Sequence, residues 1–189
     1  MSLKCENLAI PDVKILQPVQ HGDHRGFFSE TYSARAFSEV GISAVFVQDN
    51  HSLSADAGTL RGLHFQIGPF AQDKLVRVTQ GSIFDVVVDI RAGSPTYGQH
   101  VSAIISAKKW NQIWVPKGFA HGLVTLEPNT QVLYKVTNFY AADCDKGLLW
   151  NDPDLDIDWP VAESDVILSE KDKAHPKLSN LPHHFSFED

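Results

Sequence analysis

Hydrophobic and polar positions alternate through much of the middle of the chain. In the segment 84–91, apolar residues occupy the even positions from Phe84 to Ile90, and Asp85 and Asp89 fall between them. A period of two is typical of a β-strand. Similar short β-rich segments, separated by turn residues, cover 74–81, 82–95, 100–106, 111–118 and 131–140. Many short strands with frequent turns predict a mainly β protein, either a sandwich or a barrel.

Helical patterns are few and short. Residues 33–40 form one candidate helix, with Ser33 as its N-cap and Gly41 ending it. Residues 169–174 form a second, opened by Ser169. The segment 151–160 is rich in Asp and Pro and predicts an irregular connection. We expect one domain, residues 1–189, with a mixed C-terminal extension, residues 141–189, packed on the β-structure.

Charge is distributed unevenly along the chain. There are 16 Lys and Arg against 23 Asp and Glu, a net charge of −7, and residues 141–189 alone hold 4 Lys against 12 Asp and Glu. The sequence has no basic stripe of the kind that binds nucleic acid, so we expect no nucleic-acid partner. The rest of the chain is nearly neutral and can hold a local site for an anionic ligand.

Hydropathy and cysteine content narrow the cellular location. No apolar run approaches the roughly 18 residues that a membrane span needs, and the N-terminal segment lacks the apolar core of a secretory signal. Cys5 and Cys144 form neither a disulfide framework nor a metal-type spacing. We therefore expect a cytoplasmic protein without membrane contact.

One short motif bears on both fold and metal content. The run from Pro116 to His121 resembles the second conserved box of the cupin superfamily, P-x-G-x-x-H, which implies a jelly-roll β-sandwich or barrel. In metal-binding cupins the first box supplies His-x-His, but here the second position is Gln66, after His64. Two imidazoles without a third protein ligand make a poor zinc or iron site. We expect no metal and no other cofactor.

An ordered series of motifs gives a more specific resemblance. The series consists of residues 24–30 (HRGFFSE), 48–52 (QDNHS), 60–64 (LRGLH), 74–78 (KLVRV), 118–122 (GFAHG), Tyr134-Lys135 through Tyr140, and 168–172 (LSEKD). In this order and spacing the motifs closely resemble the dTDP-4-dehydrorhamnose 3,5-epimerase family, from about Val13 to Pro176. The resemblance implies a cofactor-independent isomerase that inverts C3 and C5 of dTDP-4-keto-6-deoxy-D-glucose to give dTDP-4-keto-L-rhamnose, in dTDP-L-rhamnose biosynthesis.

The resemblance also implies residue roles. His64 matches the catalytic base, Asp172 its carboxylate partner, Tyr134 the acid and Lys74 the cation beside the C4 oxygen. Positions that match contacts with the nucleotide sugar are Arg25, Glu30, Gln48, Asn50, Arg61, His121, Tyr140, Asp145 and Lys171. Tyr140 matches the residue that stacks on thymine, and Asp145 stands where the family usually has Glu. The other histidines are expected to be structural or on the surface: His21, His24, His51, His100, His175, His183 and His184.

These residue types suit proton abstraction beside a ketone. The C3 and C5 hydrogens are both alpha to the C4 carbonyl, so removing either leaves an enolate that a cation such as Lys74 stabilises. A histidine titrates near the working pH, and a carboxylate on its second nitrogen fixes the tautomer. Inversion then needs a proton donor on the opposite face, which a tyrosine such as Tyr134 can supply.

Spacing adds two geometric predictions. In one unbroken strand, Tyr134 and Tyr140 point to the same face, about 20 Å apart. Arg61 and His64 are three residues apart, so a regular strand places them on opposite faces. If both serve one site, Gly62 marks a bulge or kink.

Other functions remain open from the sequence. A mono-epimerase that inverts only C3 or only C5 uses the same residues. A non-catalytic sugar-nucleotide-binding cupin keeps the arginines and Tyr140 without needing all four catalytic groups, and a metal-dependent cupin enzyme is a third alternative. The resemblance also implies a homodimer that exchanges N-terminal strands, which covers exposed sheet edges.

Overall fold

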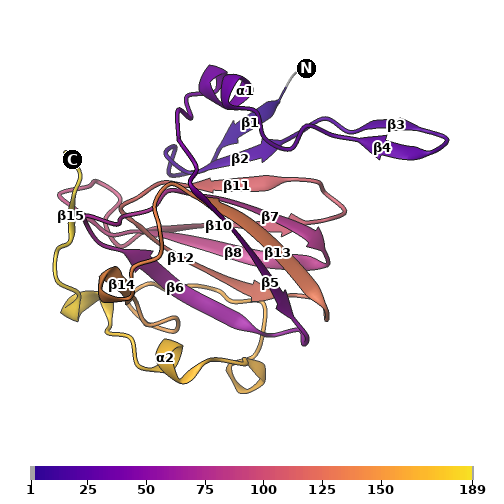
Figure 1. The fold of residues 1–189 in the computed structure, drawn as a ribbon. Coiled ribbons are helices and arrows are strands. Elements are labelled where there is room, and N and C mark those ends of the chain that lie inside the picture. The colour runs from indigo at the N-terminus through magenta and orange to yellow at the C-terminus, as the bar shows by residue number, and fades with distance from the viewer. Residues whose placement is uncertain (1–2, 189) are drawn as a thin grey trace.

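Two antiparallel β-sheets packed face to face form the body of the computed structural model, which describes residues 3–188 (Figure 1). The first sheet has the strand order β1 (Lys4–Asn7), β2 (Lys14–Gln17), β11 (Gln112–Val115), β7 (Lys74–Gln80), β13 (Thr130–Val136) and β5 (Gln48–Ser54). The second has the order β10 (His100–Ser106), β8 (Ser82–Asp89), β12 (Phe119–Thr125), β6 (Leu60–Gln66) and β14 (Asp145–Gly147). From β5 onward the chain crosses repeatedly between the sheets, so the predicted cupin-type jelly roll is confirmed.

The remaining elements lie around this sandwich. Strands β3 (His21–Asp23) and β4 (Gly26–Phe28) form a hairpin that projects from the body (Figure 1), and β9 (Arg91–Ala92) pairs in parallel with β15 (Phe185–Ser186). The helical elements are α1 (Ala34–Glu39), α2 (Glu170–Lys173) and the 3₁₀ turns η1 (Ala142–Cys144), η2 (Glu163–Asp165) and η3 (Leu178–Asn180). Both predicted helices are confirmed, and most helical elements follow residue 140, as expected.

The main hydrophobic core lies between the two sheets. Val76 and Val132 from the first sheet pack in one cluster with Ile83 and Val87 from the second, and all four are buried. These side chains are apolar and β-branched, which suits them to a pleated, buried surface. The core fills one part of the space between the sheets.

The strand β8 is buried on both faces. Val86 and Val88 point away from the main core and pack in a second cluster with Leu148 and Leu155 from the segment after residue 140. The apolar row that the sequence pattern identified therefore lies under the C-terminal segment. The row that contains Asp85 faces the interior of the sandwich, beside the main core.

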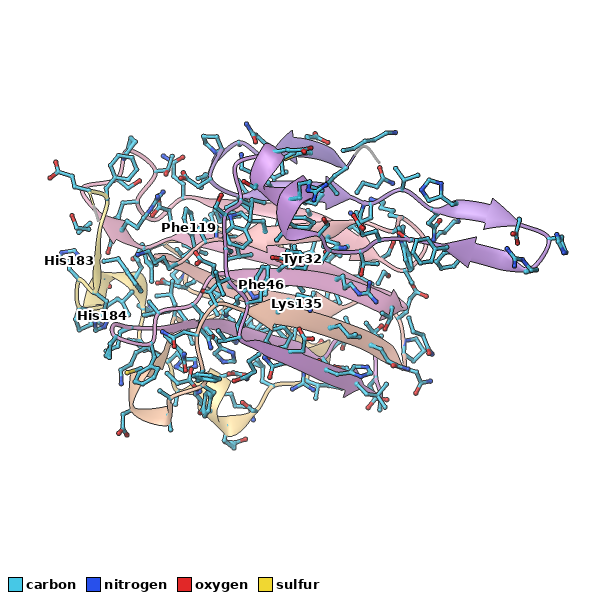
Figure 2. The ribbon with its side chains drawn as sticks, turned by 45° about the horizontal axis from the view of Figure 1, so that its top comes forward. Tyr32, Phe46, Phe119, Lys135, His183 and His184 are labelled. Atoms are coloured by element: carbon cyan, nitrogen blue, oxygen red, sulfur yellow. The ribbon has the colours of Figure 1, made fainter. Side chains whose placement is uncertain are left out.

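The outer face of the first sheet is covered in part by the chain around α1. Phe37 is buried against Trp114, and Tyr32 packs edge-to-face on Phe46 with ring centroids 5.0 Å apart. Figure 2 shows Tyr32 and Phe46 together with Lys135, whose ammonium lies 5.8 Å from the centre of the Tyr32 ring. This packing fixes the start of β5.

The irregular segment and the helices were both the subject of predictions from the sequence. Residues 151–160 contain turns and bends but no helix or strand, as predicted. None of the helices within residues 3–188 has the length and apolar content to cross a membrane.

Candidate active site

A cavity of about 420 Å³ lies between the two sheets, next to the main core. Its walls come from β6, β7, β12 and β13 and from the segment that leads into α2. The predicted site residues that line it are Arg61, His64, Lys74, His121, Tyr134, Lys171 and Asp172. All four residues expected to be catalytic are among them.

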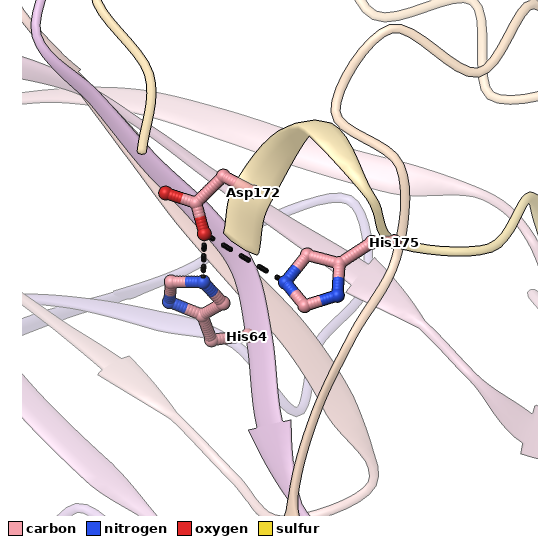
Figure 3. A group of neighbouring side chains, drawn as sticks. All are labelled: His64, Asp172 and His175. Atoms are coloured by element: carbon pink, nitrogen blue, oxygen red, sulfur yellow. Dashed lines mark hydrogen bonds and ion pairs between the residues drawn. The ribbon is translucent and has the colours of Figure 1, made fainter. Parts of the chain in front are cut away.

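The imidazole of His64 is bonded to the carboxylate of Asp172. His64 Nε2 lies 2.5 Å from Asp172 Oδ1 (Figure 3), although the residues are 108 positions apart in the chain. Asp172 sits in the first turn of α2, where its backbone N–H donates to the hydroxyl of the N-cap Ser169 at 3.2 Å. When Nε2–H donates its hydrogen bond to the carboxylate, the lone pair lies on Nδ1, and this nitrogen is available as a base.

The surroundings lower the pKa of both His64 and Asp172, which favours a neutral imidazole beside an ionised carboxylate. Burial of the imidazole lowers the pKa of His64, and the charges of Lys74 and Lys171 add to the shift, while Asp172 partly offsets it. Burial alone would raise the pKa of Asp172, but the imidazoles of His175 and His64 outweigh it, so this pKa is lowered. At neutral pH the pair is therefore a neutral base held by a carboxylate.

Two polar groups from the first sheet face this pair. Lys74, in β7, donates from Nζ to the backbone oxygen of His64 at 3.3 Å. Its burial lowers the pKa to about 8, partly offset by the charges of Asp145 and Asp85. Tyr134, in β13, has a raised pKa because it is buried, so the phenol keeps its proton at neutral pH. The first sheet supplies a cation and an acid, and the second supplies the base.

The predicted bulge at Gly62 is confirmed. Strand β6 pairs with β12 through His64↔His121 and then Arg61↔Leu123, so β6 carries one extra residue between these pairs. Gly62 has a φ of +139°, and a Cβ there would lie 2.5 Å from the Cα of Gly122. Because of this bulge, Arg61 and His64 line the same cavity although they are three residues apart.

A second histidine–carboxylate pair lies deeper in the same wall. His121 Nε2 lies 2.9 Å from Oδ2 and 3.0 Å from Oδ1 of Asp85, and the carboxylate is completely buried. Sequence reasoning missed Asp85. A usable signal was present, because a charged residue within an apolar strand needs a buried partner.

Three predicted binding residues meet at the mouth of the cavity. The Tyr140 hydroxyl donates to Asp145 Oδ2 at 3.1 Å, and the same oxygen accepts from Lys171 Nζ. Tyr140 is 62% exposed, so its ring is free to stack on a flat ligand group. The shorter Asp145 side chain still reaches both neighbours.

The prediction of one unbroken strand through Tyr140 is wrong. Strand β13 ends at Val136, because side chains hydrogen-bond to the backbone that follows: Gln72 Nε2 donates to the Asn138 oxygen at 2.7 Å, and Gln66 Nε2 donates to the Phe139 oxygen at 3.0 Å. Tyr140 therefore reaches the cavity mouth from a loop.

The other four predicted binding residues neither line the cavity wall nor belong to the group formed by Tyr140, Asp145 and Lys171. Gln48 and Asn50, on β5, bond to each other at 2.9 Å, and Asn50 pairs in register with Tyr134. Within one chain, Arg25 and Glu30 are not brought to the site. Arg25 is in the exposed turn of the β3–β4 hairpin, paired with Asp23, and Glu30 lines a small hollow beside Phe37.

The His-x-His ligand pair of metal-binding cupins is not present, because Gln66 takes the place of the second histidine. The amide of Gln66 is engaged with backbone groups, because it donates to the oxygens of Phe70 and Phe139 and accepts from Ala141 N–H. Within residues 3–188, the donor atoms of His64, Asp172 and His175 do lie within 4.8 Å of one another. Two of these donors already share the 2.5 Å hydrogen bond, an arrangement that suits proton transfer. His175 was expected to be structural or on the surface, and sequence reasoning gave no sign of this position.

Comparisons with known proteins identify the family to which the chain is similar. A dTDP-4-dehydrorhamnose 3,5-epimerase from Sinorhizobium fredii is 50% identical over 182 residues, covering 96% of this chain and 93% of the relative. The Bacillus anthracis dTDP-4-dehydrorhamnose 3,5-epimerase with TDP and PPi bound superposes with a TM-score of 0.90 at 50% identity, covering 93% of this chain and 99% of that one. The Legionella pneumophila dTDP-6-deoxy-D-glucose-3,5-epimerase, in complex with dTDP-4-keto-L-rhamnose, gives 0.94 at 43% identity, covering 99% and 100%. Because a model of the family also matches residues 7–180, the chain belongs to the dTDP-4-dehydrorhamnose 3,5-epimerase family.

Proposed function

We propose that this chain inverts C3 and C5 of dTDP-4-keto-6-deoxy-D-glucose, giving dTDP-4-keto-L-rhamnose for dTDP-L-rhamnose biosynthesis, without a cofactor. One observation carries the proposal: a base, an acid and a cation line a single cavity, and the base and acid come from opposite sheets. Inversion requires removal of a proton from one face of a carbon and delivery to the other. His64 in β6 and Tyr134 in β13 lie on opposite sheets, a placement that supports these two roles.

Each half of the reaction uses the same groups. His64 Nδ1 takes the proton alpha to the ketone, and the electrons of the C–H bond move onto the C4 oxygen. Lys74 stabilises the enolate charge as a preorganised cation. Tyr134 then gives its proton to the opposite face of the same carbon, and the C4 carbonyl is restored. His64 then loses the proton it took, and Tyr134 regains one, by exchange with water, which restores both groups. Repeating the cycle at the second carbon completes the change, and the sugar and the enzyme each end with the number of protons they began with.

The cavity mouth suits the nucleotide part of the substrate. The exposed ring of Tyr140 offers a stacking surface for thymine, and Lys171, tied to Asp145, places a cation beside the path of the diphosphate. Arg61 adds a second cation on the cavity wall. We assign substrate contacts to these residues and to Gln48, Asn50 and His121.

A homodimer would complete the site. The β3–β4 hairpin projects from the body and leaves Phe27 and Phe28 largely exposed, although one edge of Phe27 meets Trp110, and β1 is an exposed edge strand. Such features bury apolar surface and cover a sheet edge when a second copy docks. In this arrangement Arg25 and Glu30 reach the partner's cavity, which explains their distance from their own. A cytoplasmic location is also part of the proposal, and the two free cysteines fit a reducing compartment.

Proton NMR of dTDP-4-keto-6-deoxy-D-glucose with catalytic enzyme in D₂O tests the proposed function. We expect deuterium at both C3 and C5, with inversion at both. Exchange at only one carbon would identify a mono-epimerase. Binding of dTDP without exchange would identify a non-catalytic binding protein, and neither exchange nor binding would refute the proposal.

A further inference from the structure

His175 packs against β14, the strand that pairs with the His64 strand β6. The next residue, Pro176, accepts from Leu149 N–H at 2.8 Å, which ties this part of the chain to the segment after β14. Gly147 in β14 pairs in register with His64 in β6. A Cβ at Gly147 would lie 2.2 Å from His175 Nε2, so the ring occupies the space that the missing side chain leaves.

The ring contacts both members of the catalytic pair. His175 Nε2 lies 3.7 Å from Asp172 Oδ1, the same oxygen that meets His64 (Figure 3). The rings of His175 and His64 are 5.5 Å apart and nearly perpendicular, at 79°. His175 does not line the cavity, so it has no direct route to the substrate.

Packing alone does not explain an imidazole here. The His175 side chain is only 10% exposed, and Nε2 is buried without a hydrogen-bond partner among the described residues, since 3.7 Å is too long for a hydrogen bond. A buried polar atom without a partner lowers stability. An aliphatic side chain of similar size would fill the same space without this cost.

We propose that His175 is a positioning residue for the His64–Asp172 pair, a role that rests on the proposed function. Its ring limits the Asp172 carboxylate to the orientation in which Oδ1 meets His64 Nε2. It also closes the back of the pair to water. The pair is thereby kept in the tautomer and orientation that leave His64 Nδ1 as the base.

Loss of the imidazole should change the titration of His64. An aliphatic side chain removes the dipole that faces Asp172 Oδ1, so the carboxylate interacts more strongly with the His64 imidazolium. The charged and titratable groups around the His64 ring are Arg61, Lys74, His121, Tyr134, Lys171, Asp172 and His175. All but the last are unchanged in a His175 variant, so a shift reports on His175 alone.

Three variants test the role: His175→Leu, His175→Gln and, as a control, the exposed His183→Leu. Nitrogen-15 NMR follows the titration of His64 in the free protein, with His64→Asn used for assignment. For His175→Leu we expect a midpoint about 0.5 pH unit higher, a kcat about tenfold lower and a KM within about twofold of the wild type. Its melting temperature should not fall. His175→Gln, whose amide can point at Asp172, should recover kcat to within about threefold.

The opposite results would overturn the inference. A His175→Leu protein with the wild-type midpoint and kcat would show that the ring only fills space. A His175→Gln protein as slow as His175→Leu would show that no polar group is needed there. The NMR titration needs no turnover, so it decides the role of His175 even if the wild type exchanges no proton, a result that would refute the proposed function instead.

Discussion

Two histidines that line one cavity are each paired with a carboxylate, and the two pairs differ in how they are built. His121 and Asp85 lie on the neighbouring strands β12 and β8, within the second sheet. His64 and Asp172 join that sheet to α2, across 108 residues of chain. The His64 side chain is 30% exposed and the His121 side chain 9%, so His64 is the imidazole more open to a ligand.

The difference separates two tasks. The His121–Asp85 pair lies within one sheet, where the backbone hydrogen bonds between β12 and β8 hold it, and this suits a fixed contact with substrate. The His64–Asp172 pair joins β6 to α2 and depends on the packing between them. Gly147, His175 and the cap of α2 supply that packing. We therefore propose that His64 transfers the proton and that His121 binds the substrate.

Replacing the two carboxylates gives the largest expected contrast. Asp172→Asn should lower kcat about 10³-fold, because an amide no longer fixes the His64 tautomer or supports its positive charge. Asp85→Asn should lower kcat less than about tenfold but reduce the free energy of unfolding by about 1–3 kcal/mol, because its oxygens are buried and bonded. Steady-state kinetics and urea unfolding measure both. Equal losses of kcat would contradict the division of tasks.

Tyr134→Phe separates removal of the sugar proton from delivery of a proton to the opposite face. Inversion should slow about 10²-fold, while deuterium exchange at the same carbons stays within about tenfold, since His64 can return a deuteron to the face it deprotonated. Proton NMR in D₂O follows both rates. Tyr32→Phe, on the outer face of the first sheet, is the matched control. Loss of exchange as large as the loss of inversion would remove Tyr134 from the acid role.

The pH profile sharpens the assignment of the charges. The value of kcat/KM should rise with pH as His64 loses its proton, with a midpoint below the ordinary histidine value because burial lowers this pKa. It should fall near pH 8 as Lys74 loses the charge that stabilises the enolate. In Lys74→Arg the rate should be lower, and the loss near pH 8 should disappear because Arg stays charged. If the fall in kcat/KM near pH 8 persists in Lys74→Arg, it comes from the titration of another group.

Gly62→Ala tests the bulge that places Arg61 and His64 on the same wall. Its new Cβ would lie 2.5 Å from the Gly122 Cα, at a φ of +139°. We expect the free energy of unfolding to fall by about 2–4 kcal/mol, measured by urea unfolding. Gly93 also has a positive φ, but no atom lies within 4 Å of a Cβ built there. Gly93→Ala therefore measures the cost of the backbone strain without a steric clash. Equal effects in both variants would mean that the close approach is unimportant.

Local patterns predicted most of the fold. The alternation in 82–95, the serines before each helix and the turn residues gave strands and helices close to those observed. Ser169 caps α2 with its side chain, whereas Ser33 stands at the N-cap of α1 without a side-chain hydrogen bond. The Gly62 bulge followed from requiring Arg61 and His64 in one site. The strands, helices and turns depend on neighbours in the sequence, so a single chain reveals them, whereas the requirement that led to the bulge came from the family resemblance.

Long-range features were less accessible. The pairing of His64 with Asp172 came from family resemblance, because no local rule joins residues so far apart. Asp85 was missed although its place in an apolar strand signalled a buried partner. His175 was missed because it looks ordinary by itself, and Tyr140 lies in a loop fixed by side chains from elsewhere. The separation of Arg25 from the cavity depends on how the β3–β4 hairpin projects, which the sequence pattern does not specify.

The most direct test of the different roles of the two histidines compares His64→Asn with His121→Asn at saturating substrate in D₂O. With His64→Asn we expect no detectable deuterium at C3 or C5, while dTDP still binds within about twofold of the wild type. With His121→Asn we expect exchange at both carbons at no less than about a tenth of the wild-type rate. Exchange that survives in His64→Asn and vanishes in His121→Asn would contradict these roles.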